Sequence, residues 1–188
     1  MFKKCRVSRR SVYSFLYLYS VCEDSLEEAE KQGEGRFYNC LVAMLFAAFS
    51  LEAYLNYLGK RTVPFWSEIE YNKPEEKLKI ILCIIDLRLD GESFKTFKEI
   101  FRFRNVVVHA KTKSFDYNRK PIYKEEWDRD VNLKNTEKFC KSTKKIISNL
   151  HKKASEEFEE LESLENLWAI LEVGDFNNKI NVSKCKGE

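Results

Sequence analysis

Residues 36–58, RFYNCLVAMLFAAFSLEAYLNYL, decide the fold class of this 188-residue chain. Apolar side chains occupy nearly every face of a helix drawn through this stretch, which is typical of a helix at the centre of a bundle. Its length and hydropathy also fit a membrane span, but Ser50, Glu52 and Asn56 would be costly in lipid. We therefore predict a buried central helix and no membrane association.

The segments on either side predict further helices and no sheet. Only six Gly and three Pro are present, which argues for long helices rather than many turns. Gly59 is expected to end the central helix, Pro74 to open the next one, and Gly91 to break the chain before the one after. The other expected limits are a first helix over about 8–32, a fourth starting near Ser93, and a last one over about 133–172. The pattern predicts an all-α, up-down bundle of four to five helices, with a polar loop after the fourth helix and a long C-terminal helix.

Length and composition indicate one soluble domain, because 44% of the residues are hydrophobic and 34% are charged. We assign residues 1–175 to this domain and residues 176–188 to a polar, mobile tail. The six cysteines are scattered, with no Cys-x-x-Cys pair and no His at ligand spacing. This spacing predicts neither a zinc site nor a disulfide framework and favours reduced thiols in the cytoplasm, with Cys40 and Cys83 in the core.

The segment 101–109, FRFRNVVVH, carries the residues that point to a function. Asn105 and His109 are four residues apart, so on a helix their side chains lie on one face. Arg104 flanks this face, and Arg102 lies a further turn back on the side of His109. Arg and Asn bind phosphate oxygens, and imidazole changes charge near neutral pH, so the set predicts phosphate chemistry without a metal ion. The same residues also fit a structural polar cluster or cations at a helix C-terminus.

Positive charge gathers around this segment, although the whole chain carries only +3. Residues 100–124 contain a single acid, Asp116, and seven basic residues: Arg102, Arg104, Lys111, Lys113, Arg119, Lys120 and Lys124. A polyanion site requires such a patch, and we predict RNA contacts for Lys111, Lys113, Arg119 and Lys120, although a solvated face has the same composition. Residues 111–131 are expected to form a flap after His109. The aromatic residues of the flap either stack on unpaired bases or pack the loop down: Phe115, Tyr117, Tyr123 and Trp127.

The pattern Arg104-Asn105-x-x-x-His109 resembles the motif of the HEPN superfamily, in which a His follows an Arg after four to six residues and a polar residue, often Asn, directly follows the Arg. Residues 43–56, AMLFAAFSLEAYLN, resemble the core helix of that family with its internal Glu. The resemblance covers roughly residues 8–152. It implies a helical homodimer with a composite site between protomers and RNA cleavage that leaves a 2′,3′-cyclic phosphate and a 5′-hydroxyl.

In such a site Arg104 would stabilise the charge of the transition state, Asn105 would orient the 2′-hydroxyl or the phosphate, and His109 would transfer the proton. One chain offers one suitable acid-base group, because His151 lies in a Lys-rich stretch and is expected to be solvated. A two-fold dimer would supply the second His109. Glu52, on an apolar helix, needs a partner such as an Arg. It either supports the catalytic Arg or forms a structural bridge, for which Arg102 is the candidate partner.

The leading hypothesis is a metal-independent endoribonuclease without a cofactor, acting in the cytoplasm as a toxin or phage-defence effector. Its expected partners are RNA and a second copy of the chain, with an antitoxin or a nucleotidyltransferase as a further candidate. Two other classes stay open. One is a module that binds RNA or a nucleotide without cleavage, and the other is a structural dimerisation protein.

Overall fold

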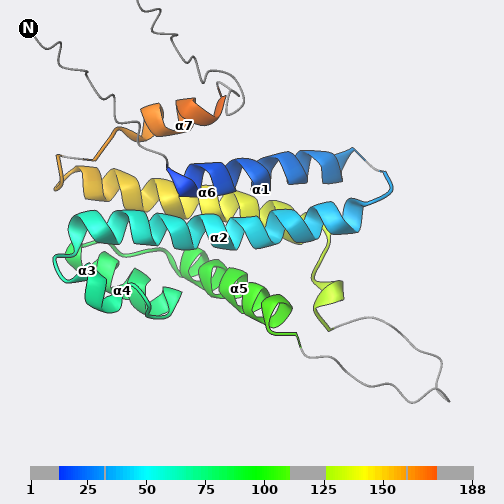
Figure 1. Ribbon diagram of the computed structural model, residues 1–188, viewed down its shortest axis with the longest axis horizontal. Coiled ribbons are helices and arrows are strands. Elements are labelled where there is room, and N and C mark those ends of the chain that lie inside the picture. The colour runs from blue at the N-terminus through cyan, green and yellow to red at the C-terminus, as the bar shows by residue number, and fades with distance from the viewer. Residues whose placement is uncertain (1–12, 32, 111–125, 160, 173–188) are drawn as a thin grey trace, which may run out of the picture.

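The computed structural model of the chain describes residues 13–31, 33–110, 126–159 and 161–172, and these form helices with no strand among them (Figure 1). The predicted all-α class is confirmed. The predicted RNA-binding residues between 111 and 125 and the predicted tail over 176–188 lie outside the described residues. The helices are α1 (Ser14–Glu30), α2 (Arg36–Thr62), α3 (Trp66–Ile69), α4 (Pro74–Ile84), α5 (Gly91–Val108), the 3-10 helix η1 (Glu126–Arg129), α6 (Leu133–Ser155) and α7 (Leu164–Glu172).

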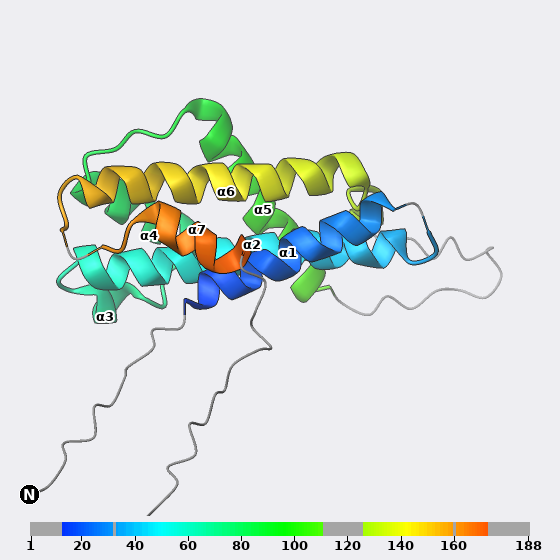
Figure 2. The ribbon, with the colours of Figure 1, turned by 90° about the horizontal axis from the view of Figure 1, so that it is seen from above.

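Helix α2 is the centre of the bundle, as predicted. It contacts α1 and α6 on one side and α4 and α5 on the other (Figures 1 and 2). The α1 and α2 helices are tied by the Ser50 hydroxyl, which donates to the carbonyl oxygen of Phe15 at 2.8 Å. Among the described helices, α2 alone is long and apolar enough to cross a membrane, and half of its most apolar window is buried inside the bundle.

Two helix limits differ from the prediction for identifiable reasons. Helix α2 continues past Gly59 to Thr62, and the glycine serves packing rather than termination, because the Trp66 ring lies where a Cβ atom of residue 59 would be. Helix α5 begins at Gly91 rather than near Ser93, because Asp90 is its N-cap: the Asp90 carboxylate accepts hydrogen bonds from the Ser93 N–H at 2.7 Å and the Ser93 hydroxyl at 2.8 Å.

The C-terminal region corrects the prediction of one helix over 133–172. Helix α6 ends at Ser155, and α7 turns back over the bundle to lie beside α1 (Figure 1). The apolar side chains beyond Ser155 explain the reversal, because Leu167 is fully buried and the Trp168 ring lies 5.4 Å from the ring of Tyr19. A continuous helix would have left these side chains in water.

The cysteines follow the prediction in part. Cys40 is buried, but Cys83 is exposed, which corrects its expected place in the core. The sulfur atoms of Cys22 on α1 and Cys140 on α6 lie 2.8 Å apart in the core. This hydrogen bond, together with burial, raises the pKa of the Cys22 thiol, so that the thiol stays protonated at neutral pH.

His151 was expected to be solvated, but it is fully buried. Its Nε2 atom lies 2.8 Å from the carbonyl oxygen of Glu162, and its ring stacks on Tyr57. Nδ1 is buried with no hydrogen-bond partner among the described residues. Burial lowers the pKa of His151 despite the bond to Glu162, because protonation would place an unpaired N–H and a charge in the core.

We expect the free energy of unfolding to fall as the pH is lowered from about 7 towards 5. In this window the unfolded chain protonates His151 near its ordinary pKa of about 6.5, whereas the lowered pKa in the folded chain moves this protonation to lower pH, so unfolding takes up a proton. Urea unfolding at a series of pH values measures the slope. His151→Gln is expected to flatten it, and His109→Gln, at an exposed position, is expected to retain it. Equal slopes in the two variants would contradict the assignment.

Candidate functional site

The last turns of α5 present three of the predicted site residues to solvent. Arg102, Asn105 and His109 are all exposed. At about 100° per residue they fall within about 60° of one another around the helix. His109 is the C-cap residue of α5, and its backbone N–H donates to the Asn105 carbonyl oxygen at 3.0 Å. This face therefore combines a guanidinium, an amide and an imidazole that solvent can reach.

Arg104 points away from this face and into the bundle. Its Nη2 atom donates to Glu52 Oε2 on α2 at 2.7 Å, and its guanidinium carbon lies 5.5 Å from the centre of the Phe101 ring. The Arg104 side chain is 17% exposed and that of Glu52 is 30% exposed. Arg104 Nε is buried with no hydrogen-bond partner among the described residues. The Arg that pairs with Glu52 is therefore Arg104 and not Arg102.

Lys77 completes the cluster, and sequence reasoning missed it. This residue of α4 is buried, with its Nζ atom 2.9 Å from Asn56 Oδ1 and 3.9 Å from Glu52 Oε1. Burial lowers the pKa of Lys77, and the nearby Glu52 carboxylate opposes that shift. A signal was present in the sequence, because Lys77 precedes the buried Ile81 and Ile85 by four and eight residues and so lies on their apolar stripe.

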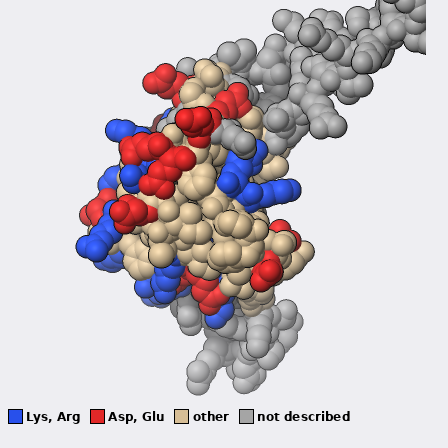
Figure 3. All heavy atoms as spheres, turned by 90° about the vertical axis from the view of Figure 1, so that its left-hand side faces the viewer, with Lys and Arg blue, Asp and Glu red and all other residues tan. Residues whose placement is uncertain are grey.

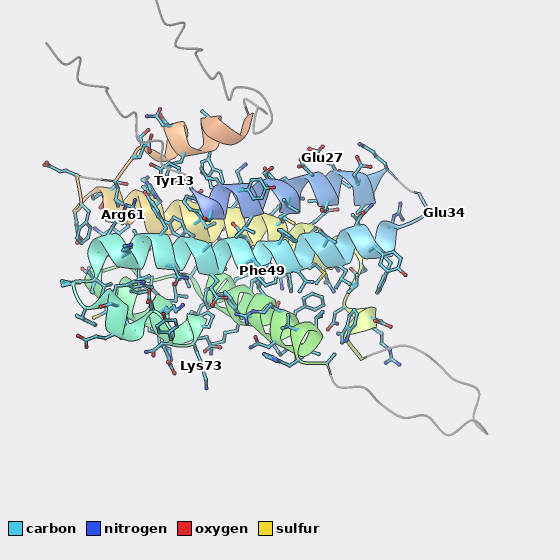
Figure 4. All side chains as sticks on the ribbon, viewed as in Figure 1. Tyr13, Glu27, Glu34, Phe49, Arg61 and Lys73 are labelled. Atoms are coloured by element: carbon cyan, nitrogen blue, oxygen red, sulfur yellow. The ribbon has the colours of Figure 1, made fainter. Side chains whose placement is uncertain are left out.

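The cluster places two cations around one carboxylate. Each oxygen of Glu52 faces a different cation, Arg104 on α5 and Lys77 on α4. The formal charges of Glu52, Lys77 and Arg104 sum to +1. The ion pair with Glu52 holds the Arg104 guanidinium in one position. Phe49, one turn before Glu52, lies on the side of α2 that faces α5 (Figure 4). Chemically, the arrangement offers a held positive charge close to the helix turn that carries the exposed Asn105 and His109.

A pocket of about 450 Å³ adjoins the cluster between α2, α3 and α4. It is lined by Glu52, Asn56, Lys60, Trp66, Glu70, Tyr71, Asn72 and Lys77. Its volume falls within the range of small-molecule sites, about 300–1,000 Å³. Glu52 belongs both to the wall of this pocket and to the ion pair with Arg104, so pocket and motif helix share a residue.

The charged residues at the end of the molecule where α2 terminates are mixed in sign. At the end of the molecule where α2 terminates, Lys and Arg side chains are interspersed with Asp and Glu (Figure 3). The four predicted RNA-binding residues, Lys111, Lys113, Arg119 and Lys120, lie outside the described residues. Of the flap aromatics, Trp127 is described, and its ring stacks on Phe37 at 6.4 Å between ring centres. Trp127 therefore packs against the start of α2.

Comparisons with known proteins add no relative: no protein-family model, curated protein or solved structure matches the chain.

We expect Glu52→Gln to lower the free energy of unfolding by about 2 kcal/mol, because it leaves the buried ammonium of Lys77 and the guanidinium of Arg104 without a counter-charge. Lys77→Met keeps the Glu52–Arg104 bond and removes the buried charge, so it is expected to cost less. Urea unfolding measures both variants.

The matched control is Glu68→Gln, at an exposed position on α3, for which we expect a change within about 0.5 kcal/mol. A Glu52→Gln protein as stable as this control would show that the cluster contributes nothing to folding.

Proposed function

We propose that this chain is a metal-independent endoribonuclease of the HEPN type, which cleaves RNA at a composite site across a homodimer. The observation that carries the proposal is the end of α5, where an exposed imidazole and amide share the last turns of the helix with a guanidinium that Glu52 holds on the bundle side. The setting as a toxin or phage-defence effector in the cytoplasm follows from the resemblance of Arg104-Asn105-x-x-x-His109 to that family, and an antitoxin or nucleotidyltransferase remains the candidate partner.

The chemistry follows from the side chains. One His109 takes the proton of the 2′-hydroxyl, and the freed 2′-oxygen attacks the adjacent phosphorus atom. The His109 of the second protomer gives a proton to the departing 5′-oxygen, which leaves a 2′,3′-cyclic phosphate and a 5′-hydroxyl. Arg104 stabilises the charge on the phosphorane oxygens, and Asn105 orients the reacting groups by amide hydrogen bonds. Arg102, exposed on the same face, attracts the RNA backbone.

The surface around the motif favours a second copy of the chain as the partner. Val106 and Val108 are 45% and 53% exposed, and they flank Asn105 and His109 on either side of the helix. Apolar side chains beside a polar site are typical of interfaces. In a two-fold interface every contact occurs twice, and residues near the axis lie close to their own copies. An interface whose axis passes beside the end of α5 therefore brings the two His109 side chains together.

A specific observation also favours the second candidate, a module that binds RNA or a nucleotide without cleaving it. Arg104 is largely buried and bonded to Glu52, so its charge already serves the packing of α5 on α2. A site in which Arg104 only stabilises the fold would keep its affinity for RNA and lack cleavage. Activity and affinity therefore have to be measured on the same preparations.

We expect the purified protein to cleave single-stranded RNA in the presence of a metal chelator, with products that carry a cyclic phosphate. His109→Ala is expected to reduce the cleavage rate at least about 100-fold, the usual contribution of a general acid or base. Gel analysis of end-labelled RNA measures both the rate and the end groups.

Lys95→Ala is the matched control, because Lys95 is an exposed cation near the start of the same helix, more than two turns from the motif. It is expected to keep the wild-type rate. Cleavage that survives in His109→Ala, or that the chelator abolishes, would contradict the proposal. RNA binding without any cleavage by the wild type would select the non-catalytic module.

We expect Val108→Asp to weaken the dimer and to reduce cleavage in parallel, because a carboxylate in an apolar interface loses its hydration. Val108 is half exposed, so the protomer itself is expected to keep its stability. Sedimentation measures the oligomeric state, and Tyr17→Asp, at an exposed aromatic residue of α1, is the control. A wild-type protein that is monomeric at the concentrations used for the assay would refute the composite site.

A further inference from the structure

The pocket between α2, α3 and α4 is separated from the Arg104 guanidinium by a single side chain, that of Glu52. Glu52 contacts Arg104 with Oε2 and forms part of the pocket wall, where Oε1 faces Lys77. A nucleotide whose phosphate lies at Arg104 therefore has its base within reach of this pocket. Nothing in the cleavage mechanism itself uses the pocket.

The charges that line the pocket favour a neutral polar ligand there rather than a phosphate group. The pocket is lined by two ammonium groups and two carboxylates, which are Lys60, Lys77, Glu52 and Glu70. The Glu52 carboxylate is also shared with Arg104, and Lys77 donates to Asn56. A phosphate would meet carboxylates at short range, whereas a heterocycle with both donors and acceptors would satisfy groups of both kinds.

Two aromatic side chains give the pocket flat walls. Trp66 is buried against Gly59, where a side chain on residue 59 would overlap the indole ring, so the position of that ring is fixed by the backbone of α2. Tyr71, between α3 and α4, is 90% exposed although it lines the pocket. An aromatic ring left in water beside a polar pocket is suited to stacking on a base.

We propose that this pocket binds a guanine base of the RNA substrate, and this inference rests on the proposed function. Glu70 is the specificity-determining residue, because it forms no ion pair or side-chain hydrogen bond among the described residues and interacts with Lys77 only at longer range, while both oxygens of Glu52 face cations. A free carboxylate accepts two hydrogen bonds from the adjacent N1–H and N2–H groups of guanine. Adenine, cytosine and uracil each offer a single donor group beside an acceptor on that edge, so one carboxylate oxygen would face a lone pair.

The rest of the pocket matches the other edge of the same base. Guanine carries two acceptors, O6 and N7, to which Lys groups donate in nucleic-acid complexes. Lys60, exposed at the rim, supplies that donor, and Tyr71 covers the face of the ring. The buried Lys77 holds Asn56 and Glu52 in place and is a positioning residue.

The test is calorimetric titration of the full chain with each of the four 5′-nucleoside monophosphates at one salt concentration. All four carry the same phosphate, so differences in affinity report the base. We expect GMP to bind most tightly. Glu70→Gln is expected to weaken GMP about tenfold, the effect of losing one paired base contact, and to leave AMP unchanged. Tyr71→Ala, at an exposed position, is expected to weaken all four nucleotides to a similar extent.

Glu68→Gln is the control, because Glu68 lies on α3 two residues before Glu70, is exposed, and does not line the pocket. It is expected to bind GMP as the wild type does. Equal affinity for the four nucleotides, no saturable binding, or a GMP preference that survives in Glu70→Gln would each overturn the inference.

The outcomes separate this inference from the proposed function. Cleavage of RNA by a protein without a GMP preference would leave the function standing and refute the guanine pocket. A GMP preference that depends on Glu70, in a protein that cleaves no RNA, would support the pocket and refute the nuclease.

Discussion

The bond between Arg104 and Glu52 is the interaction on which the rest of the site depends. Glu52 is a charge on the central, largely apolar helix of the bundle, and it requires a cation from a neighbouring element. Once Arg104 of α5 supplies that cation, the rotation of α5 is set. Residues on a helix are separated by about 100°, so an arginine turned towards α2 directs Asn105 and His109 away from it. This ion pair acts together with the buried aromatic side chains of α5, Phe97, Phe101 and Phe103, to fix the packing of the helix and the direction of its exposed face.

The cluster of Glu52, Arg104 and Lys77 places charged groups where a helical bundle usually has apolar side chains. Buried ion pairs are often no more stabilising than apolar residues of the same size, because the charges lose their hydration. Here a second cation, Lys77, is buried against the same carboxylate, where one cation would satisfy the pairing. Apolar packing alone does not call for this arrangement. In the proposed nuclease this fixed positive charge would bind the phosphate of a nucleotide whose base enters the pocket.

The sequence predicted the elements better than their contacts. The apolar character of α2, Pro74 at the start of α4 and the shared face of Asn105 and His109 follow from local periodicity. The choice between Arg102 and Arg104 does not, because the two lie about 200° apart on a helix and only the packing of α5 decides which faces α2. The burial of His151 and Lys77 was not predicted from the sequence, for a related reason. Each sits among charged neighbours in the chain, and only an apolar stripe at helical spacing marks it as buried.

The two histidines of the chain differ enough to restrict where a second acid-base group can come from. His151 is buried, bonded to the Glu162 carbonyl oxygen and stacked on Tyr57, so it can neither reach RNA nor accept a proton without cost. Lys77 is buried as well and bonded to Asn56. Among the described residues His109 is therefore the one imidazole that solvent can reach. Metal-free RNA cleavage needs both a base and an acid, so a histidine mechanism on this fold requires a second copy of α5.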